Sequence, residues 1–561
     1  MDEIKAKEIF DIAQKKFEKN ENKSARDLWL QLLDFYPKNL SLLRNISLTY
    51  FKQNKLFETE DILKKILDIN LKETNALKML ILVLEDQDKI TEAKKFIQIG
   101  IDNNILSNHW KIKMNVMIPM IKMNKNIIEK FRSDIKKFIN EILNDKKNYN
   151  FNIDDHLVKP PQFGLSYDQF DNLEINKICV SMFRKIYPEL NKTHAIQNIP
   201  SSKIKIGFIS EYLTDHTIGK LFKGIILKLD KKNYDVKIFH TEQTKKGSIL
   251  NDLISEEKKG SVKNIFLPKN FQQKQDLILN EKLDILFYPE VGLSLQLYFL
   301  SFIKLARYQV TSWGHPETTG NNSIDYFISS SLIEAKDYEE RFSEKVILSD
   351  SLPMFYYKPK VKNLLKEEQI NKASRYSCPQ TLFKLHPDFD KIIEGIQKED
   401  KNSVFYFIKD PKKILYKIFI ERLKKNSKID LDKIIFLENM NWEEYINHCG
   451  EVSVLLDPLF FGAGNSFYES LFYGTPTISL PTNYTKSRLV LGAYNQMKIS
   501  DLRLKPIVKD IDEYIVRSVT VANDRNLLEL KKTLQAKAEK NLYEYNKSID
   551  DLDKIFKKIV N

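Results

Sequence analysis

The sequence predicts helical repeats at the N-terminus followed by two Rossmann-like α/β lobes. Three N-terminal segments align at a spacing of about 34 residues, the period of the tetratricopeptide repeat. After residue 203 the pattern changes to short β-rich runs that alternate with amphipathic helices, and it starts again after residue 376. Strands that alternate with helices predict parallel doubly wound sheets with ligand sites beyond the carboxyl ends of the strands. The predicted fold class is therefore α followed by α/β.

The repeats are supported by the residue types at the expected positions. The three segments are 6–39, 40–73 and 74 to about 107. In the first, Ala13 and Ala25 are small enough to let two helices approach closely, Trp29 fills the space between helices, and Pro37 ends the second helix. The second segment fits less closely, so generic helical hairpins are the alternative. Either form gives a stacked surface suited to peptides or partner proteins.

The rest of the chain divides by the same patterns. Apolar spacing predicts helix over 108–148 and again over 166–187, with a break at Lys159-Pro160-Pro161. Strands are expected at 204–209, 236–239, 283–288 and 308–311 in the first lobe, and at 404–408, 434–437, 454–457 and 477–480 in the second. The predicted domains are repeats over 1–107, a helical lead-in over 108–200, the two lobes over 201–375 and 376–520, and C-terminal helices over 521–561.

Composition narrows the classes of function. The chain has 561 residues and a formal net charge of +13, which raises the possibility of a nucleic-acid partner. Lysines are spread among 76 acidic residues without an arginine-rich arm, so scattered surface charge is the better interpretation and no nucleic-acid partner is expected. Three distant cysteines, Cys179, Cys378 and Cys449, form neither a disulfide framework nor a zinc spacing. With no signal peptide and no membrane-length apolar run visible, a cytoplasmic location without membrane association is expected.

The segment from Leu456 to Pro476 predicts a phosphate-binding loop. A strand is expected to end at Asp457, and a helix to begin near Asn465 or Ser466. The small residues between them permit close approach of a ligand to the backbone, and the N-terminus of a helix offers free N–H groups to a diphosphate. The alternative is an ordinary strand–loop–helix connection with a serine at the helix start.

Four segments in order resemble the O-linked N-acetylglucosamine transferase and Spindly family. They are Ile206–His216, Ala306–Gly320, Leu382–Asp390 and Leu456–Pro476. The resemblance covers roughly residues 160–500 and follows helical repeats, as in that family. It implies the GT-B architecture, inversion at the anomeric carbon without a metal, and transfer of a sugar, typically N-acetylglucosamine from its UDP derivative, to Ser or Thr of proteins. Transfer of glucose to Asn, as in one branch, and of fucose from a GDP donor are the alternatives.

The same resemblance implies the residues of the site. The expected catalytic residues are His216, His315 and Lys384. The residues expected at the nucleotide are Met440, Tyr445, Gly464, Asn465, Ser466 and Glu469. In this assignment the pair Asn465–Ser466 lies beside the phosphates and Glu469 accepts ribose hydroxyls. Tyr445 lies beside the base, although it could equally be a core residue.

Lysine and histidine at these positions have clear chemical uses. The Lys384 cation is expected to neutralise charge on the departing nucleoside diphosphate. His216 is either a general base or a hydrogen-bond partner of phosphate or acceptor, and His315 either meets the substrate or orients a turn. Glu290, at the end of a strand, is a weaker base candidate. No cofactor is expected beyond the donor substrate.

No metal site is expected either, because no cluster of His and Asp is visible and Lys384 with a helix N-terminus can handle a diphosphate. Asp388-Phe389-Asp390 has the appearance of a metal motif but belongs to the Lys384 segment. The helical repeats are expected to select a protein or peptide acceptor. The alternative from another class is a scaffold whose transferase lobes have lost activity, against which the intact Lys384 and Asn465–Ser466 positions argue.

Overall fold

A computed structural model describes residues 3–196, 201–426, 428–499 and 503–561. It divides into two compact units. The first contains Met1–Ile121, Leu157–Lys159 and Pro411–Ile418, and the second contains Lys122–His156, Pro160–Asp410 and Phe419–Asn561. The five domain boundaries drawn from the sequence stay a prediction.

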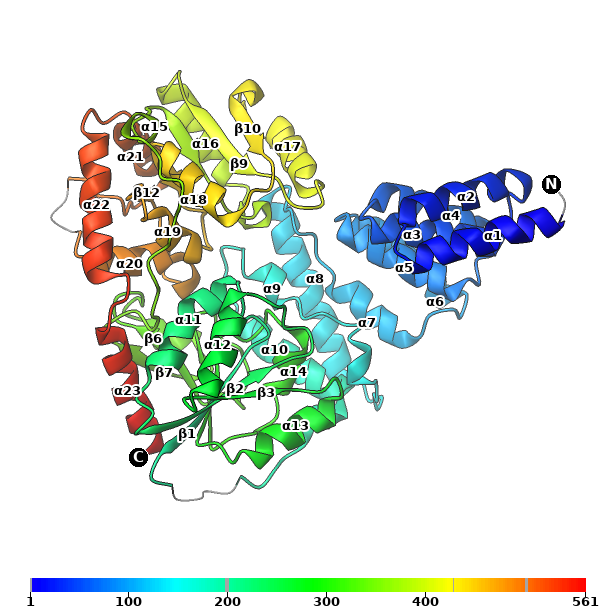
Figure 1. The fold of residues 1–561 in the computed structure, drawn as a ribbon, viewed down its shortest axis with the longest axis horizontal. Coiled ribbons are helices and arrows are strands. Elements are labelled where there is room, and N and C mark those ends of the chain that lie inside the picture. The colour runs from blue at the N-terminus through cyan, green and yellow to red at the C-terminus, as the bar shows by residue number, and fades with distance from the viewer. Residues whose placement is uncertain (1–2, 197–200, 427, 500–502) are drawn as a thin grey trace. The chain divides into compact units, whose positions relative to one another are not determined.

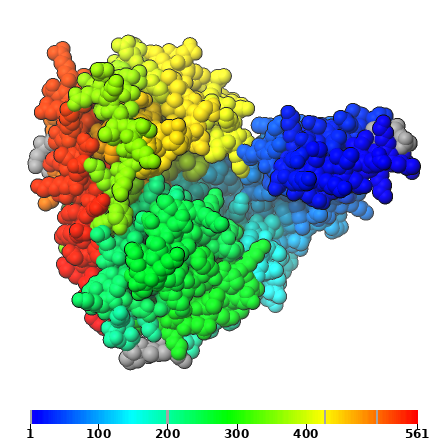
Figure 2. Space-filling view, in the orientation of Figure 1, coloured from blue at the N-terminus to red at the C-terminus, as the bar shows by residue number. Residues whose placement is uncertain are grey.

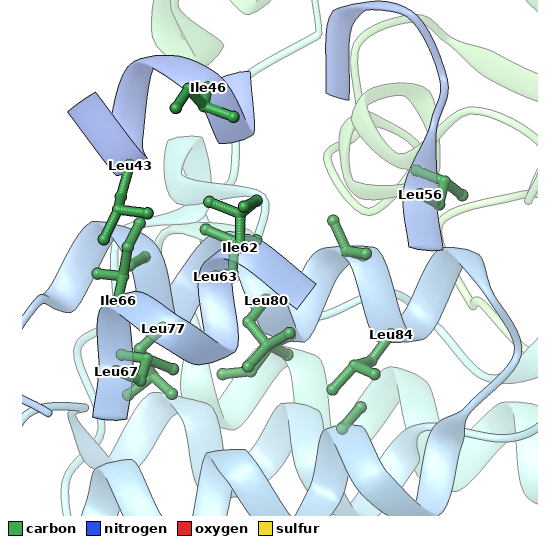
Figure 3. Packing of buried hydrophobic residues seen from close by; sticks show 14 of the residues in the cluster. Leu43, Ile46, Leu56, Ile62, Leu63, Ile66, Leu67, Leu77, Leu80 and Leu84 are labelled. Carbon is green, nitrogen blue, oxygen red and sulfur yellow. The ribbon is translucent and has the colours of Figure 1, made fainter. Parts of the chain in front are cut away.

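The first unit consists of helices paired as the spacing of 34 residues predicted. They are α1 (Glu3–Glu18), α2 (Asn22–Phe35), α3 (Leu40–Lys52), α4 (Leu56–Ile69), α5 (Thr74–Asp86), α6 (Ile90–Asp102) and α7 (Asn108–Val116). The small residues Ala13 and Ala25 and the large Trp29 are fully buried, which confirms their roles in helix contact. Leucines and isoleucines of successive helices, such as Leu43, Leu63 and Leu77, fill the shared core (Figure 3). The N-terminal part is therefore built of stacked helical hairpins.

A segment remote in sequence completes the core of this unit. Ile414, on the stretch Pro411–Ile418, is buried among the repeat residues, and Ile418 packs beside it. Lys412 on the same stretch forms an ion pair of 2.8 Å with Asp86 of α5. Hydrophobic periodicity could not predict this contact because it joins residues more than 300 positions apart.

The first lobe of the second unit contains a seven-stranded sheet in the order β3-β2-β1-β4-β5-β6-β7, with parallel pairing throughout. Its strands are β1 (Ile204–Ile209), β2 (Tyr234–His240), β3 (Lys263–Phe266), β4 (Ile285–Tyr288), β5 (Tyr308–Ser312), β6 (Tyr326–Ser330) and β7 (Lys345–Ser349). Its helices are α11 (Thr217–Lys228), α12 (Ser248–Lys258), α13 (Phe271–Asn280) and α14 (Leu295–Leu300). The sequence-based prediction omitted β3, β6 and β7: β3 has exposed residues at both ends, and β6 and β7 end in serine.

The second lobe contains a five-stranded parallel sheet in the order β10-β9-β8-β11-β12. Its strands are β8 (Arg375–Ser377), β9 (Val404–Ile408), β10 (Ile434–Leu437), β11 (Val454–Leu456) and β12 (Thr477–Ile478). Its helices are α15 (Glu367–Ile370), α16 (Phe389–Glu399), α17 (Leu415–Asn426), α18 (Trp442–Glu451), α19 (Asn465–Ser470) and α20 (Leu489–Met497). Two parallel sheets covered by helices confirm the predicted pair of Rossmann-like lobes (Figure 1).

Between the repeats and the first strand, helices lead into the lobes. They are α8 (Lys125–Asn144), the four-residue α9 (Gln162–Leu165) and α10 (Leu173–Ile186). The helical stretch predicted from 108 to about 148 contains α7 and α8, and residues 117–124 between them are not helical. The prediction of helix from residue 166 was wrong, because α10 begins only at Leu173. Asn172 bonds the side chain of Glu317 and the carbonyl of Leu165, so tertiary hydrogen bonds hold this stretch outside the helix.

The C-terminal helices are α21 (Ile511–Ala522), α22 (Leu527–Asn541) and α23 (Lys547–Val560). Helix α21 packs on α16 of the second lobe, whereas α23 packs on β7 of the first, so this red segment runs along both lobes (Figure 2). Phe556 of α23 is fully buried against Phe287 and Tyr234 of the first sheet. None of the helices in the described parts of the chain is long and apolar enough to cross a membrane.

Gly474 provides a test of the turn that follows α19. Its φ is +65°, and a Cβ at this position would lie 1.8 Å from the carbonyl oxygen of Lys531. Gly260 has a similar φ of +72° but open space around it, which makes it a matched control. We expect Gly260→Ala to lower the free energy of unfolding by about 1–2 kcal/mol through backbone strain alone. Gly474→Ala should cost about 1–3 kcal/mol more because of the added overlap, as measured by denaturant unfolding. Equal costs would contradict the overlap argument.

Candidate functional site

The predicted lysine lies next to the loop that the sequence assigned to phosphate. Lys384 ends the short 3-10 helix η4 (Leu382–Lys384), which follows β8. Its Nζ donates to Gln380 Oε1 at 3.0 Å, and Gln380 Nε2 in turn donates to the hydroxyl of Ser466 at the start of α19. The side chains of Lys384 and Ser466, 82 positions apart, are therefore joined through one glutamine that the sequence analysis did not single out.

The amine of Lys384 is held in a poorly solvated environment. Burial lowers the pKa of Lys384 to about 8, although the nearby Asp457 carboxyl favours the charged form. The Phe461 ring centroid lies 5.0 Å from Nζ. A partly desolvated cation beside aromatic and polar groups interacts strongly with an arriving anion, because water screens the charge less there.

The loop before α19 is held by Asp457. This buried carboxyl accepts from the N–H of Ala463 at 2.6 Å and from the hydroxyl of Ser479 at 2.5 Å. Burial raises the pKa of Asp457 to about 7. Phe460 in the same loop has a φ of +67°, in the left-handed region that favours glycine. The loop is thus shaped by its own hydrogen bonds as well as by its glycines.

The helix start lies where the sequence placed it. Gly464 precedes α19, which begins at Asn465 and has only six residues. The Oδ1 atom of Asn465 accepts from the hydroxyl of Tyr356 at 2.7 Å. A Cβ at Gly464 would have room, since the nearest atom is 3.6 Å away on Leu489. The polar pair is therefore at the predicted place, with Asn465 fixed by an aromatic residue of the segment that connects the lobes.

Glu469 joins the two lobes. Its Oε1 accepts from Lys220 Nζ of α11 at 2.5 Å and from Trp442 Nε1 of α18 at 2.7 Å. Lys220 also lies 5.4 Å from the Trp442 ring centroid. No sequence pattern pointed to Lys220 or Trp442 at this site, because neither stands out among the lysines and aromatic residues of the chain.

Two residues are expected near the nucleotide's base: Met440, which lies just before α18, and Tyr445, which lies within it. Met440 is half-buried in the loop that links β10 to α18. Tyr445, on α18, packs against a small cluster of Ile446, Phe472 and Tyr473, and its buried hydroxyl lies near the side chains of Cys449 and Ser466. Burial holds the pKa of Tyr445 well above its usual value. These contacts suit a core role, and contact of Tyr445 with a nucleotide stays a prediction.

His216 is the N-cap residue of α11. Its Nδ1 accepts from the backbone N–H of Ile218 at 3.3 Å, and its ring packs on Tyr212 at 4.5 Å between centroids. Burial, followed by repulsion from Lys220 and Lys245, lowers the pKa of His216 to about 4. In the neutral ring the proton consequently sits on Nε2, which makes this nitrogen a hydrogen-bond donor.

His315 is buried beside a network of polar groups. Its Nε2 lies 3.4 Å from Ser166 Oγ, and its ring lies 6.4 Å from that of Phe461 in the loop before α19. Glu317, two residues on, forms an ion pair of 2.7 Å with Lys486 of the second lobe. Burial lowers the pKa of His315, and Glu317 opposes that change only in part. Sequence patterns did not single out Ser166 or Lys486, and Glu317 lay in the segment Ala306–Gly320 without an assigned role.

Glu290 does not face an open site as expected. It is fully buried, with Oε1 accepting from Ser210 at 3.2 Å and Oε2 from the N–H of Leu293 at 3.1 Å. Burial raises the pKa of Glu290 to about 8. A carboxyl enclosed in this way is a poor candidate for direct contact with an acceptor.

The acidic pair in the Lys384 segment has structural partners. Asp390 forms a buried ion pair of 2.7 Å with Arg422, which also donates to the carbonyl of Leu385 at 2.7 Å, while Asp388 pairs with Lys125 at 2.6 Å. In the described ranges there is no group of three or more His, Cys, Asp or Glu that could hold a metal ion. These contacts fix the backbone next to Lys384.

Comparisons with known proteins give relatives of one kind. No family model matches the chain. It is 26% identical over 242 residues to an Arabidopsis thaliana protein named "Probable UDP-N-acetylglucosamine–peptide N-acetylglucosaminyltransferase SEC", covering 41% of this chain and 24% of that protein. It is 26% identical over 263 residues to a UDP-glucose:protein N-beta-glucosyltransferase of Actinobacillus pleuropneumoniae, covering 44% of this chain and 40% of that protein. The chain thus spans less than half the length of these relatives.

The chain is similar to protein glycosyltransferases of the O-linked N-acetylglucosamine transferase type. A solved structure of a mutant O-GlcNAc transferase from Thermobaculum terrenum superposes with a TM-score of 0.70 at 13% identity, covering 99% of this chain and 97% of that one. At this identity the superposition establishes the fold. The fold is that of helical repeats joined to a GT-B glycosyltransferase, as the sequence predicted.

The charge of Lys384 provides a test of this site by direct binding. We expect the affinity for UDP to fall as the pH rises above 8, because the amine with a pKa of about 8 then loses its proton. Bound diphosphate favours the protonated amine and raises its pKa in the complex, so the fall should begin near pH 8 and level off above the pKa of the complex. Lys384→Arg should hold its affinity to higher pH, since arginine stays protonated. Calorimetric titrations from pH 8 to 10 would measure both; a parallel decline in the two proteins would show that another group is responsible.

Proposed function

We propose that this chain is an inverting, metal-independent glycosyltransferase that moves a sugar from a nucleotide donor to protein side chains. N-acetylglucosamine from UDP-N-acetylglucosamine is the proposed sugar, and Ser or Thr hydroxyls are the proposed acceptors. The observation that carries the proposal is the meeting of Lys384, Gln380 and Ser466 at the loop before α19. The similarity of this chain to named protein glycosyltransferases also supports the proposal.

The proposed reaction uses the charges that the site provides. An acceptor hydroxyl attacks the anomeric carbon while the bond to the nucleoside diphosphate breaks. Lys384 then neutralises the growing charge on the leaving group, an effect that a desolvated cation exerts more strongly than a hydrated one. Glu469 is proposed to accept a ribose hydroxyl with Oε2, since Oε1 already accepts from Lys220 and Trp442.

Two features bear on the acceptor. The stacked helices of the first unit provide an extended surface of the kind that binds peptides, so we assign acceptor selection to them. We place the activity of the protein in the cytoplasm.

A second candidate function is transfer of glucose to Asn, favoured by the similarity to the Actinobacillus N-glucosyltransferase. Incubating candidate acceptor proteins with a panel of UDP- and GDP-sugars and weighing the products would separate these activities. No mass increase with any donor, together with no donor hydrolysis, would favour the inactive scaffold.

The role of Lys384 can be measured in the transfer itself. If its charge matters more in the transition state than in the bound donor, Lys384→Ala should lower kcat by roughly 10²-fold while donor affinity falls less. Lys391→Ala is the matched control, because Lys391 pairs with Asp388 at 3.1 Å on the exposed side of the same segment. Transfer rates and donor affinities of folded variants would be compared. Near-normal transfer by Lys384→Ala would remove the residue from the mechanism.

Metal independence is testable by chelation. Because Lys384 and the polar start of α19 supply the groups expected to handle the diphosphate, we expect transfer to continue in excess EDTA at its original rate. Rates would be compared before and after addition of EDTA and again with Mg²⁺ or Mn²⁺ restored. Activity abolished by EDTA and recovered with metal would contradict this part of the proposal.

A further inference from the structure

We propose that Ser166, Glu317 and Lys486 are positioning residues that hold a proton on Nε2 of His315 and leave its Nδ1 free to accept the proton of the acceptor group. The inference rests on the proposed function, because it assigns the base of that reaction. It follows from the geometry of a buried network that the sequence did not reveal.

Both oxygens of the Glu317 carboxylate in this network accept hydrogen bonds. Glu317 Oε1 accepts from Lys486 Nζ and from Asn172 Nδ2, each at 2.7 Å, and its Oε2 lies 2.5 Å from Ser166 Oγ. Burial by itself would raise the pKa of Glu317, but Lys486, His315 and the hydrogen bonds outweigh it and hold the pKa below its usual value. An ionised carboxylate only accepts hydrogen bonds. The hydroxyl of Ser166 must therefore be the donor in its contact with Glu317.

The hydroxyl of Ser166 has one proton, and it donates that proton to Glu317. Besides Glu317, its hydroxyl lies 2.8 Å from the carbonyl oxygen of Gln162, which is also an acceptor only. Towards His315 Nε2, 3.4 Å away, Ser166 can consequently offer only a lone pair. The ring must donate from Nε2. Because burial keeps the ring neutral near pH 7, Nδ1 carries no proton.

The backbone of Gly292 lies next to the free nitrogen. Its φ is +122°, and a Cβ there would be in ordinary contact with the ring, 3.9 Å from Nδ1, so a side chain at this position would lie against the nitrogen that glycine leaves uncovered. The centroids of the Phe163 and Phe461 rings lie 6.5 Å and 6.4 Å from that of the imidazole. Among the described residues, no hydrogen bond to Nδ1 competes with an incoming hydroxyl.

The other histidine carries its proton on the same nitrogen, Nε2, but its Nδ1 lone pair is already used. Nδ1 of His216 already accepts from the N–H of Ile218, so its lone pair is in use and Nε2 carries the proton. His216 can donate to a phosphate or an acceptor oxygen but has no free lone pair. Of the two predicted histidines, the base is therefore His315.

The step is balanced in protons and electrons. The acceptor oxygen forms a bond to the anomeric carbon as its proton passes to His315 Nδ1. The bond from that carbon to the diphosphate oxygen breaks, and its electron pair leaves with the nucleoside diphosphate beside Lys384. The resulting imidazolium is stabilised through Ser166 by the Glu317 carboxylate, as an orienting carboxylate stabilises other catalytic histidines.

Lys486 also connects this network to the donor loop. Its backbone carbonyl accepts from the N–H of Gly462 at 2.8 Å, and Gly462 adjoins Phe461. The same lysine thus holds Glu317 with its side chain and the loop near Lys384 with its backbone. The base and the leaving-group site are positioned by one residue.

The proposal is tested by determining which ring nitrogen of His315 carries the proton. Wild-type protein labelled with ¹⁵N only at its 8 histidines would be examined by ¹⁵N NMR, with His315→Gln used to assign the signal. We expect a neutral ring protonated at Nε2. A ring protonated at Nδ1 in the wild type would overturn the proposal without any need for a variant of the network.

Variants then test how the proton is held. Ser166→Ala should allow both tautomers and lower kcat about tenfold or more, while UDP affinity stays within about twofold. Ser518→Ala is the matched control, because Ser518 is equally buried and its hydroxyl also lies 2.8 Å from the carbonyl oxygen of the residue four positions earlier. For Lys486→Met the control is Lys274→Met, a buried lysine on α13 that pairs with Glu242 at 3.6 Å. The controls should leave both the tautomer and kcat unchanged.

Each outcome has a distinct meaning. An unchanged tautomer and unchanged kcat in folded Ser166→Ala and Glu317→Gln would overturn the positioning role. Failure of the wild type to bind UDP or transfer any sugar would contradict the proposed function, and the NMR result would still report whether the network fixes the ring. A tautomer change with no effect on kcat would remove His315 as the base.

Discussion

The buried ion pair between Glu317 and Lys486 is the contact on which the arrangement of the site depends. Removing one partner of such a pair typically costs about 3–5 kcal/mol, because a charge is left without its counter-ion. Here the pair joins the first lobe to the second at 2.7 Å, and Ser166 and Asn172 of the lead-in segment complete the carboxylate. His315 and the loop before α19 are consequently held in one geometry by three distant parts of the chain.

A second link between the lobes lies at Glu469, which accepts from Lys220 of one lobe and Trp442 of the other. Lys384 contrasts with both pairs, since it bonds a neutral glutamine and has no ion-pair partner within 4 Å in the described residues. Burial without a paired carboxylate lowers its pKa to about 8. The two ion pairs join side chains of the two lobes, whereas the unpaired amine of Lys384 is the cation that the proposed function assigns to the donor diphosphate.

Much of the fold could be predicted because local residue patterns specify its helices and strands. The 34-residue spacing placed helices at Leu40 and Thr74, and β-rich runs marked β1, β9 and β10 to the residue. Strand β8 was not predicted because Arg375-Tyr376-Ser377 lacks the run of apolar residues that marked β11. The start of α10 was missed because Asn172 bonds Glu317 instead of continuing a helix.

By itself, the sequence determined the two kinds of structure and the positions of His216, His315, Lys384 and the Asn465–Ser466 pair, because these lie in contiguous segments whose residue order is informative. Only the tertiary structure decided which side chains surround them. Gln380 joins Lys384 to Ser466, Lys220 reaches Glu469, and Ser166 lies against His315 through contacts between residues from 4 to 249 positions apart. Hydrogen bonds and ion pairs depend on distances of about 3 Å in space, and sequence separation does not encode those distances.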